Sequence, residues 1–216
     1  MDMKLIKTFA INLKKRPDRR KHIMQEFKLK SEFDFSLAEA VEHKNGAIGL
    51  WKTIRNIVAN ESCSSLEYII ISEDDHEFTT PYNKEALFRA IEEAKEKNAD
   101  VLMGGVSWFS DAVQVSSNLF WVDQFTGTQF VVVYKKFFDK IINTHFNQGD
   151  TADRKIAELT VNKFMMYPFI SIQKEFGYSD ATTKNNVDGY VTQIFDKTSE
   201  KLVHLVKVGS FYNLKF

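Results

Sequence analysis

The segment Leu66–Phe78, LEYIIISEDDHEF, constrains the fold more than any other part of the chain. A tyrosine and three isoleucines precede three consecutive carboxylates, Glu73, Asp74 and Asp75. A short apolar run rich in β-branched residues predicts a strand that is buried on both faces. In open α/β sheets, ligands bind at the carboxyl ends of such strands. The three acids are therefore expected at the edge of the sheet where a ligand binds.

The spacing of the acids suggests what they could bind. Side chains alternate along a strand, so Glu73 and Asp75 should share one face and Asp74 the other, unless the backbone turns. Adjacent carboxylates repel one another, and Mg²⁺ or Mn²⁺ with oxygen ligands relieves that repulsion. A solvated acidic turn is the alternative interpretation, and the triplet alone does not decide between the two.

Strand and helix patterns alternate along the 216 residues, which predicts one α/β domain with a mixed, mostly parallel sheet flanked by helices. Besides the central strand, the expected strands are Leu5–Leu13, Phe33–Val41, Val101–Val106, Phe120–Val122, Phe130–Tyr134 and Phe164–Ile172. The expected helices are Asp18–Leu29, Ala47–Ala59, Lys84–Lys97, Lys135–Phe146 and Arg154–Lys163. We assign residues 1–180 to this domain and 181–216 to a tail that packs on it or extends it. Within the tail, order is expected at Tyr190–Phe195 and Lys201–Val208.

Charge and composition narrow the classes of partner. The chain has 29 basic and 29 acidic residues, so it lacks the basic excess typical of nucleic-acid-binding proteins. Its single cysteine, Cys63, excludes an intramolecular disulfide and fits a reducing compartment. The N-terminal stretch has too short an apolar segment for a signal peptide or a membrane span. We therefore expect a cytoplasmic protein, and any exposed members of its 19 phenylalanines could contact a partner or the inner face of a membrane.

Basic residues gather after the first predicted strand, in the segment from Lys14 to His22. Asn12 at the end of that strand and Arg16, Arg19 and Arg20 after it are close to the start of a predicted helix, a position that favours phosphate groups. A basic first turn is also common on solvated helices. Farther along, Gly104-Gly105 could let the backbone approach a ligand closely, or could only relieve crowding in the sheet.

Several weak motifs in this order resemble glycosyltransferase family 25, which includes lipooligosaccharide and collagen galactosyltransferases. They are INLKKRPDRR at Ile11–Arg20, GAIGLWKTI at Gly46–Ile54, YIIISEDD at Tyr68–Asp75, the segment Thr126–Ile142, Asp153 before a helix, and Met166–Asp180. The order of these motifs is more specific than any one of them.

The resemblance implies a GT-A-type nucleotide-sugar-binding fold and a metal-dependent transfer of a sugar, with inversion, from a nucleotide diphosphate such as UDP. Asp75 would be the principal ligand of Mn²⁺ or Mg²⁺, with Asp74 in support. The acceptor would be a glycan, a lipid-linked glycan or a lipopolysaccharide. By the same analogy Asn12, Arg16 and Arg19 would contact the nucleotide, and Glu73 or Asp74 would be a supporting ligand or a ribose contact. Together with Gly46 and the glycine pair Gly104-Gly105, these residues are the predicted binding site of the nucleotide sugar.

An inverting transfer also needs a carboxylate that takes the proton of the acceptor hydroxyl. Asp153 is the first candidate and Asp150 the second, because both lie in a loop at the start of a predicted helix. Capping of that helix is the alternative role of Asp153. Family members usually carry Ser-His where this chain has Gly49-Leu50, so galactose is only one candidate donor sugar.

Three other functions share these features. A nucleotidyltransferase would need a glycine-rich phosphate loop after the first strand, where this chain has KKRPDRR. A metal-dependent phosphohydrolase would release phosphate without an acceptor sugar. A binding protein that has lost turnover would bind the nucleotide without transfer, which the missing Ser-His could reflect.

Overall fold

The computed structural model describes residues 5–178, 185 and 187–214. Its sheet strands are β1 (Ile6–Asn12), β2 (Phe33–Glu39), β3 (Tyr68–Glu73), β5 (Val101–Met103), β7 (Ala112–Gln114), β8 (Leu119–Val122), β10 (Phe130–Tyr134) and β11 (Lys163–Met166). Two small sheets pair β4 (His76–Phe78) with β12 (Ser171–Gln173), and β6 (Trp108–Phe109) with β9 (Phe125–Thr126). The helices are α1 (Pro17–Phe27), α2 (Gly46–Glu61), α3 (Lys84–Glu96), η1 (Lys135–Phe137), α4 (Phe138–Asn143), α5 (Ala152–Leu159) and α6 (Tyr190–Phe211).

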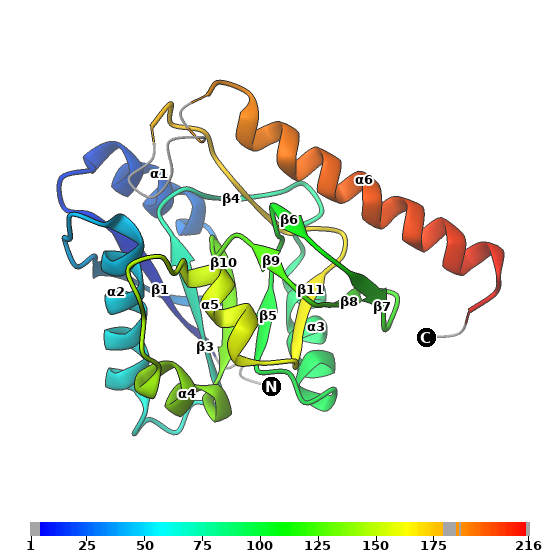
Figure 1. The fold of residues 1–216 in the computed structure, drawn as a ribbon, viewed down its shortest axis with the longest axis horizontal. Helices are drawn as coiled ribbons and strands as arrows, with labels where there is room; N and C mark the ends of the chain where they lie inside the picture. Colours follow the sequence, from blue (N-terminus) through cyan, green and yellow to red (C-terminus); the bar gives the residue numbers. More distant parts are fainter. Residues whose placement is uncertain (1–4, 179–184, 186, 215–216) are drawn as a thin grey trace.

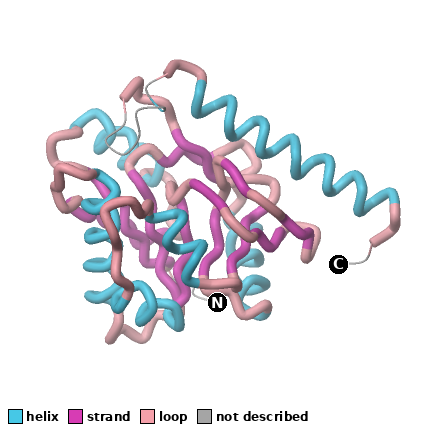
Figure 2. The backbone as a smooth tube through the Cα atoms, in the orientation of Figure 1, coloured by secondary structure: helices cyan, strands magenta, loops and turns pink. Residues whose placement is uncertain are grey.

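The large sheet has eight strands in the order β2-β1-β3-β10-β5-β11-β8-β7. The pairings make β8 and β10 antiparallel to the other six strands, so the sheet is mixed with one dominant strand direction. Helices cover both of its faces (Figures 1 and 2). The predicted α/β class and its mixed sheet flanked by helices are confirmed.

The central strand divides two hydrophobic cores, because its side chains alternate. Ile69 and Ile71 belong to the core that α2, α4, α5 and α6 cover, whereas Ile70 belongs to the core under α1 and α3. All three isoleucines are at most 3% exposed. The expectation of a strand buried on both faces is therefore confirmed.

Several predicted elements are shorter or divided in the structure, and two of them differ most because local breaks were missed. The predicted strand Phe164–Ile172 is divided into β11 and β12 around Pro168, which has no amide hydrogen to donate to a sheet. The predicted helix Arg154–Lys163 begins earlier, as α5, and ends at Leu159, and Lys163 is the first residue of β11.

The C-terminal part contains one helix, α6, where the sequence predicted two shorter ordered pieces. Val191, Phe195, Thr198 and Leu202 are buried at helical spacing, and Val191, Phe195 and Leu202 join the core that contains Ile69. The helix extends past the edge of the sheet in Figure 1. The predicted boundary between residues 180 and 181, and the Ser179-Asp180 end of the last motif, lie outside the described residues. No described helix is long and apolar enough to cross a membrane.

Candidate functional site

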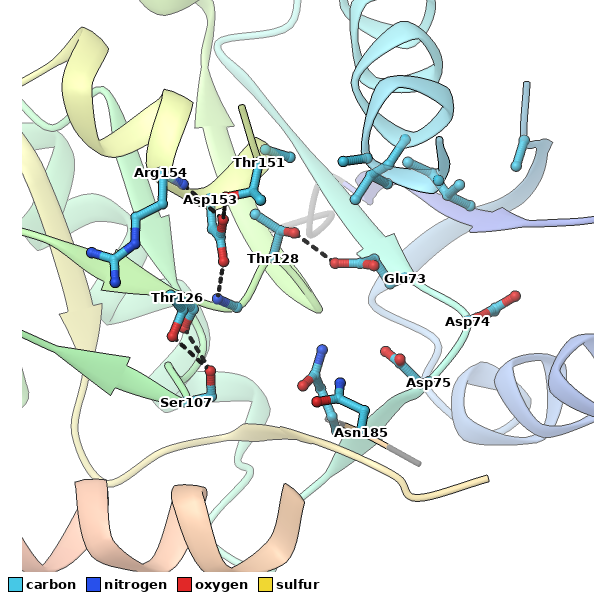
Figure 3. Close-up of a pocket in the computed structure, with 18 of the residues that line it drawn as sticks. Glu73, Asp74, Asp75, Ser107, Thr126, Thr128, Thr151, Asp153, Arg154 and Asn185 are labelled. Atoms are coloured by element: carbon cyan, nitrogen blue, oxygen red, sulfur yellow. Dashed lines mark hydrogen bonds between the residues drawn. The ribbon is translucent and has the colours of Figure 1, made fainter. Parts of the chain in front are cut away.

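A cavity of about 950 Å³ lies at the carboxyl ends of the first three parallel strands. Ile11 and Leu13 line it from the end of β1, Ala40 and Val41 from the chain after β2, and the acidic triplet from the end of β3. Its opposite wall comes from Ser107 just before β6, from β9 and the turn after it, from the start of α5 and from the first turns of α6 (Figure 3). The position agrees with the expectation that a ligand site forms where parallel strands end.

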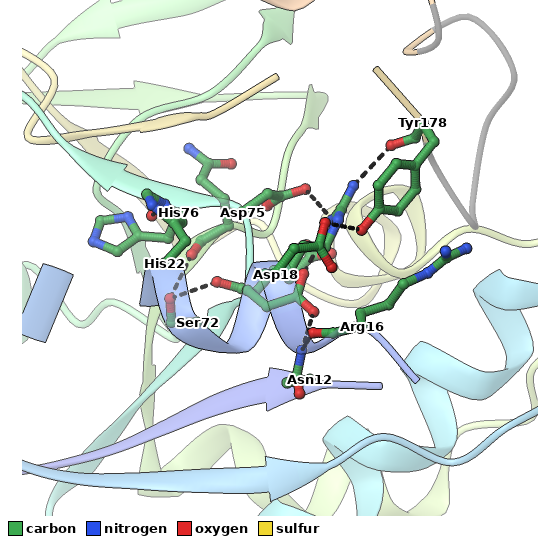
Figure 4. Close-up of polar contacts among 12 residues, drawn as sticks. Asn12, Arg16, Asp18, His22, Ser72, Asp75, His76 and Tyr178 are labelled. Atoms are coloured by element: carbon green, nitrogen blue, oxygen red, sulfur yellow. Dashed lines mark hydrogen bonds and ion pairs between the residues drawn. The ribbon is translucent and has the colours of Figure 1, made fainter. Parts of the chain in front are cut away.

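Asp74 holds the first strand, the first helix and the central strand together. Its Oδ2 accepts a hydrogen bond of 2.7 Å from Asn12 Nδ2, and its Oδ1 lies 3.0 Å from Arg19 Nη1. Asn12 Nδ2 also donates to the carbonyl oxygen of Arg16, at 3.2 Å (Figure 4). Asp74 is 8% exposed. Both carboxylate oxygens therefore already accept from a donor, and the role of Asp74 as a supporting metal ligand stays a prediction.

Arg19 joins the two aspartates. Its Nη1 lies 3.0 Å from Asp74 Oδ1 and 3.2 Å from Asp75 Oδ2, and its Nη2 donates to the carbonyl oxygen of Tyr178 at 2.8 Å. The guanidinium lies 4.8 Å from the centres of the Phe176 and Tyr178 rings. Asp74 and Asp75 thus converge on one cation, contrary to strict alternation, because the strand ends at Glu73 and the chain turns before β4.

Asp75 differs from its neighbour in having an unpartnered oxygen. Its Oδ1 is buried and accepts no hydrogen bond from the residues that the structure describes. Burial raises the pKa of Asp75 above its ordinary value, although the charge of Arg19 acts in the opposite direction. A buried carboxylate oxygen without a partner, in a residue that lines the cavity, suits a hard cation.

Glu73 lies on the same cavity wall. Burial raises its pKa, the charge of Asp75 raises it further, and a hydrogen bond of 2.6 Å from Thr128 Oγ1 lowers it. Thr128 was not singled out in the sequence. It follows Gly127, whose φ of 107° requires a residue without a side chain, and that glycine between two threonines was the available signal.

Asp153 is the second residue of α5, and Thr151 is its N-cap position. Asp153 Oδ1 accepts from Arg154 N at 2.8 Å and from Thr151 Oγ1 at 2.5 Å, and its Oδ2 accepts from Gly127 N at 3.1 Å. The carboxylate therefore fastens the start of α5 to the turn between β9 and β10, and it lines the cavity. Both roles that the sequence left open are compatible with this position.

Asp150 lies at the cavity wall but is held differently. Its Oδ2 accepts from Asn147 N at 2.7 Å and forms an ion pair of 2.9 Å with Lys155. The hydrogen bond from Asn147 and the bond to Lys155 lower the pKa of Asp150. A carboxylate with a lowered pKa is a weaker base, so Asp150 remains the second candidate.

The other donor-side candidates are not all brought together. Gly46 begins α2 and lines the cavity. Arg16 has its guanidinium 4.2 Å from the centre of the Tyr178 ring and, like Asn12, is not among the described residues of the cavity wall.

Gly104 and Gly105 are also outside the described cavity wall. A Cβ atom on Gly105 would lie 2.2 Å from the carbonyl oxygen of Ser171, and one on Gly104 would lie 2.8 Å from Phe130 Cδ1. These glycines therefore permit close approach of the protein's own chain. This agrees with the alternative that they relieve crowding in the sheet.

The acidic side chains of the cavity could hold a divalent cation only together with other ligands. Among the described residues, no group of three or more His, Cys, Asp or Glu is arranged to hold a metal ion. Oxygen ligands of a bound nucleotide diphosphate can complete the shell of a Mg²⁺ ion that has only one or two protein carboxylates. Asp75, with its unpartnered oxygen, fits such a site, and the prediction of Mn²⁺ or Mg²⁺ remains a prediction.

Comparisons with known proteins do not assign the chain to a family. No protein-family model matches the chain, and neither does any curated protein sequence. Among solved structures it is similar to apo UDP-glucose pyrophosphorylase, with 10% identity and a TM-score of 0.47 over 90% of this chain and 82% of that one. It is also similar to HddC from Yersinia pseudotuberculosis, with 13% identity and a TM-score of 0.43 over 93% of this chain and 80% of that one.

A third similar structure is a glycosyltransferase involved in the glycosylation of the major capsid of PBCV-1, with 14% identity and a TM-score of 0.41 over 64% of each chain. All three TM-scores are below 0.5, so these similarities do not indicate a substrate or an activity for this chain. The resemblance to glycosyltransferase family 25 therefore rests on the sequence motifs alone.

Proposed function

We propose that the protein is a metal-dependent glycosyltransferase that transfers a hexose to a glycan or a lipid-linked glycan. The donor would be a nucleotide diphosphate sugar, with UDP as the first candidate nucleotide, and the transfer would invert the anomeric centre. The observation that carries the proposal is the cavity at the carboxyl ends of β1, β2 and β3, which collects Glu73, Asp74, Asp75 and Asp153 around one space. Its volume of about 950 Å³ is within the range of small-molecule and cofactor sites.

The donor would lie along the wall that Leu13, Lys15 and the acidic triplet form. Lys15 lines the cavity, and its side chain is 55% exposed despite an ion pair with Glu42. Its ammonium group can therefore reach a phosphate, where it would stabilise the charge that grows on the leaving group. Arg19 is enclosed by two aspartates and a carbonyl oxygen, so we assign it the positioning of Asp74 and Asp75.

Asp75 would be the protein ligand of the divalent cation. Asp74 would hold Arg19 in place, and Arg19 in turn would orient the carboxylate of Asp75. When bound, Mn²⁺ or Mg²⁺ supplies positive charge next to the diphosphate leaving group. Glu73, fixed by Thr128, would contact the donor beside this position.

Asp153 would accept the proton of the acceptor hydroxyl. Donors from Gly127, Thr151 and Arg154 hold its carboxylate in place, which is the preorganisation that a general base requires. In the view of Figure 3 it lies between Glu73 and Arg154. Cytoplasmic location and contact with a membrane-borne acceptor belong to the same proposal.

A thermal-shift panel tests the proposal. UDP, UDP-glucose, UDP-galactose, GDP-mannose and UTP are each added with Mn²⁺ or with EDTA. A ligand at 100 times its dissociation constant stabilises the folded state by about 2.7 kcal/mol, which is easily detected. We expect one nucleotide sugar to raise Tm in the presence of Mn²⁺ and to have little effect with EDTA.

Turnover distinguishes the competing functions. Release of UDP that requires an added glycan acceptor would support the glycosyltransferase. Free phosphate without an acceptor would identify a phosphohydrolase, and formation of a nucleotide sugar from UTP and a sugar phosphate would identify a nucleotidyltransferase. Nucleotide-sugar binding without turnover would identify a binding protein, and no binding of any nucleotide would refute the proposal.

A further inference from the structure

Arg154 is a cation in the cavity wall that the proposed function does not use. It is the third residue of α5 and lines the cavity immediately after Asp153. In Figure 3 its side chain lies on the side of Asp153 away from Asp74 and Asp75, and its guanidinium ends to the left of Thr126. The donor's charged groups are assigned to the other side, so Arg154 faces the part of the cavity that remains for the acceptor.

The guanidinium of Arg154 lies over the ring of Trp108. Its carbon Cζ lies 4.4 Å from the centre of the Trp108 ring, and Trp108 is 38% exposed. A cation–π contact uses the charge of the guanidinium and does not occupy its N–H groups as hydrogen-bond donors. None of these N–H groups donates a hydrogen bond or joins an ion pair within the part of the chain that the structure describes, and none is a buried unpartnered atom.

The acids near Arg154 are already neutralised or bonded. Glu158, which also lines the cavity, pairs with Lys155 at 3.0 Å, and Lys155 also pairs with Asp150. The Asp153 carboxylate receives backbone and hydroxyl donors. Two hydroxyl groups lie on the same wall, Ser107 Oγ and Thr126 Oγ1, 2.9 Å apart. The wall thus offers a cation and two hydroxyl groups, and the ring of Trp108 lies against the cation.

From this arrangement we infer that Arg154, oriented by Trp108, binds an anionic group on the acceptor, so the acceptor is an acidic sugar. A guanidinium edge matches the two oxygens of a carboxylate or a phosphate in a bidentate contact. This inference rests on the proposed function, because it names the substrate class of the same site. Its own content is a binding preference, which can be measured without turnover.

Binding of small sugars to the UDP-saturated and the nucleotide-free protein tests the inference. The probes are methyl glucuronide, glucose 6-phosphate and neutral methyl glucoside, measured by saturation-transfer NMR and titration. The first two distinguish a carboxylate from a phosphate. We expect at least one anionic sugar to bind about 10- to 100-fold more tightly than the neutral sugar, the size expected of a charge-assisted contact.

The variants isolate the guanidinium. Arg154→Gln should remove the preference for the anionic sugar, and Arg154→Lys should keep only part of it, because an ammonium group cannot form the bidentate contact. Arg55→Ala removes an exposed arginine of α2 that does not line the cavity, and it should leave the preference unchanged. Thermal unfolding of each variant confirms that it is folded.

Three outcomes would overturn the inference: equal binding of anionic and neutral sugars, a preference that survives Arg154→Gln, or no anionic-sugar binding at all. Donor binding is measured separately with Mn²⁺ and a nucleotide sugar. If donor binding is normal and the preference is absent, only the inference fails. If no nucleotide binds but the Arg154-dependent preference is present, the proposed function fails and the acidic-sugar site stands.

Discussion

Asp74 and Asp75 are adjacent in the sequence but have different chemistry. Asp74 has both oxygens engaged by Asn12 and Arg19, whereas Asp75 keeps one buried oxygen without a partner among the described residues. Position in the strand does not produce this difference. It arises because the chain turns after Glu73 and brings both carboxylates to one guanidinium.

Asp75→Asn should abolish the Mn²⁺-dependent part of nucleotide-sugar binding, because a neutral amide is a much weaker ligand of a hard cation than a carboxylate. The fold should survive, since Asn has the same size and can still accept from Arg19. Titration calorimetry with and without Mn²⁺ measures the effect. Asp139→Asn, which changes an exposed acid of α4, is the control. Unchanged metal-dependent affinity in Asp75→Asn would show that the ligand is elsewhere.

Asp153→Asn should lower transfer by a factor of about 10²–10⁴, the usual contribution of a general base. The structure adds a cost in stability, on the order of 1 kcal/mol, because an amide cannot accept from Gly127, Thr151 and Arg154 together. Donor binding should remain. Steady-state kinetics and urea unfolding are measured on the same samples.

Thr151→Ala is the matched control for Asp153. It removes one donor to the same carboxylate but keeps the proposed base. If Thr151→Ala and Asp153→Asn lower transfer equally, Asp153 acts by fastening α5. If only Asp153→Asn lowers transfer, the carboxylate itself is required.

At the scale of elements, the start of α6 depends on a side chain outside the helix. Gly189, at the N-cap position, has a φ of 74° and cannot cap the helix with a side chain. Glu175 supplies the acceptors: its Oε2 accepts from Gly189 N at 2.8 Å and its Oε1 from Thr192 N at 2.9 Å. These hydrogen bonds, the one from Thr192 first, lower the pKa of Glu175.

Glu175→Gln should reduce stability by about 1 kcal/mol at neutral pH, because the amide has one acceptor oxygen for the two backbone N–H groups and carries no charge. The folded-state pKa lies below the ordinary value of 4.5, so the unfolded state binds more protons between the two values. The contribution of the carboxylate is therefore complete above pH 4.5 and is lost as the pH falls through the folded-state pKa. Urea unfolding at pH 7 and at pH 4 measures it.

The difference between the wild type and Glu175→Gln should shrink at the lower pH. Glu200→Gln, which changes an exposed acid of α6, should have little effect at either pH. A difference that stays constant with pH would show that the capping carboxylate is not the cause.

At the scale of the whole molecule, α6 is part of the core despite its position at the end of the chain. Leu202 is fully buried, and Thr198 Oγ1 donates to the carbonyl oxygen of Ser107 at 2.8 Å. Tyr190 and Ile194 from the same helix line the cavity. The same helix therefore contributes side chains to the hydrophobic core and to the wall of the cavity.

Leu202→Ala should lower the free energy of unfolding by about 2–5 kcal/mol, the cost of a cavity in a packed core. Val208→Ala, on the same helix but 51% exposed, should change it by less than about 0.5 kcal/mol. Urea unfolding followed by circular dichroism should show one transition that shifts. A separate early loss of helix in Leu202→Ala would mean that α6 unfolds independently of the sheet.

Local sequence alone determined the elements that have strong periodicity. The apolar runs predicted β3 as a strand buried on both faces, and Phe130–Tyr134 as β10 with the same ends. The acidic triplet was therefore placed correctly at the carboxyl end of a central strand. The two-residue strands β6 and β9 were missed, because such short pairs have no periodicity and form only through contacts across the chain.

Only the tertiary structure decided which partners these residues have. Arg19 lies 55 residues from Asp74, Gly127 lies 26 residues from Asp153, and Arg154 meets Trp108 across two elements. Gly104 and Gly105 proved to face the protein's own chain for the same reason. Periodicity reports how one segment divides between core and solvent, whereas hydrogen bonds, ion pairs and stacking depend on where distant segments meet. The sequence therefore located the acids, and the packing of β1, α1, α5 and the turn after β9 around them determined what each acid can do.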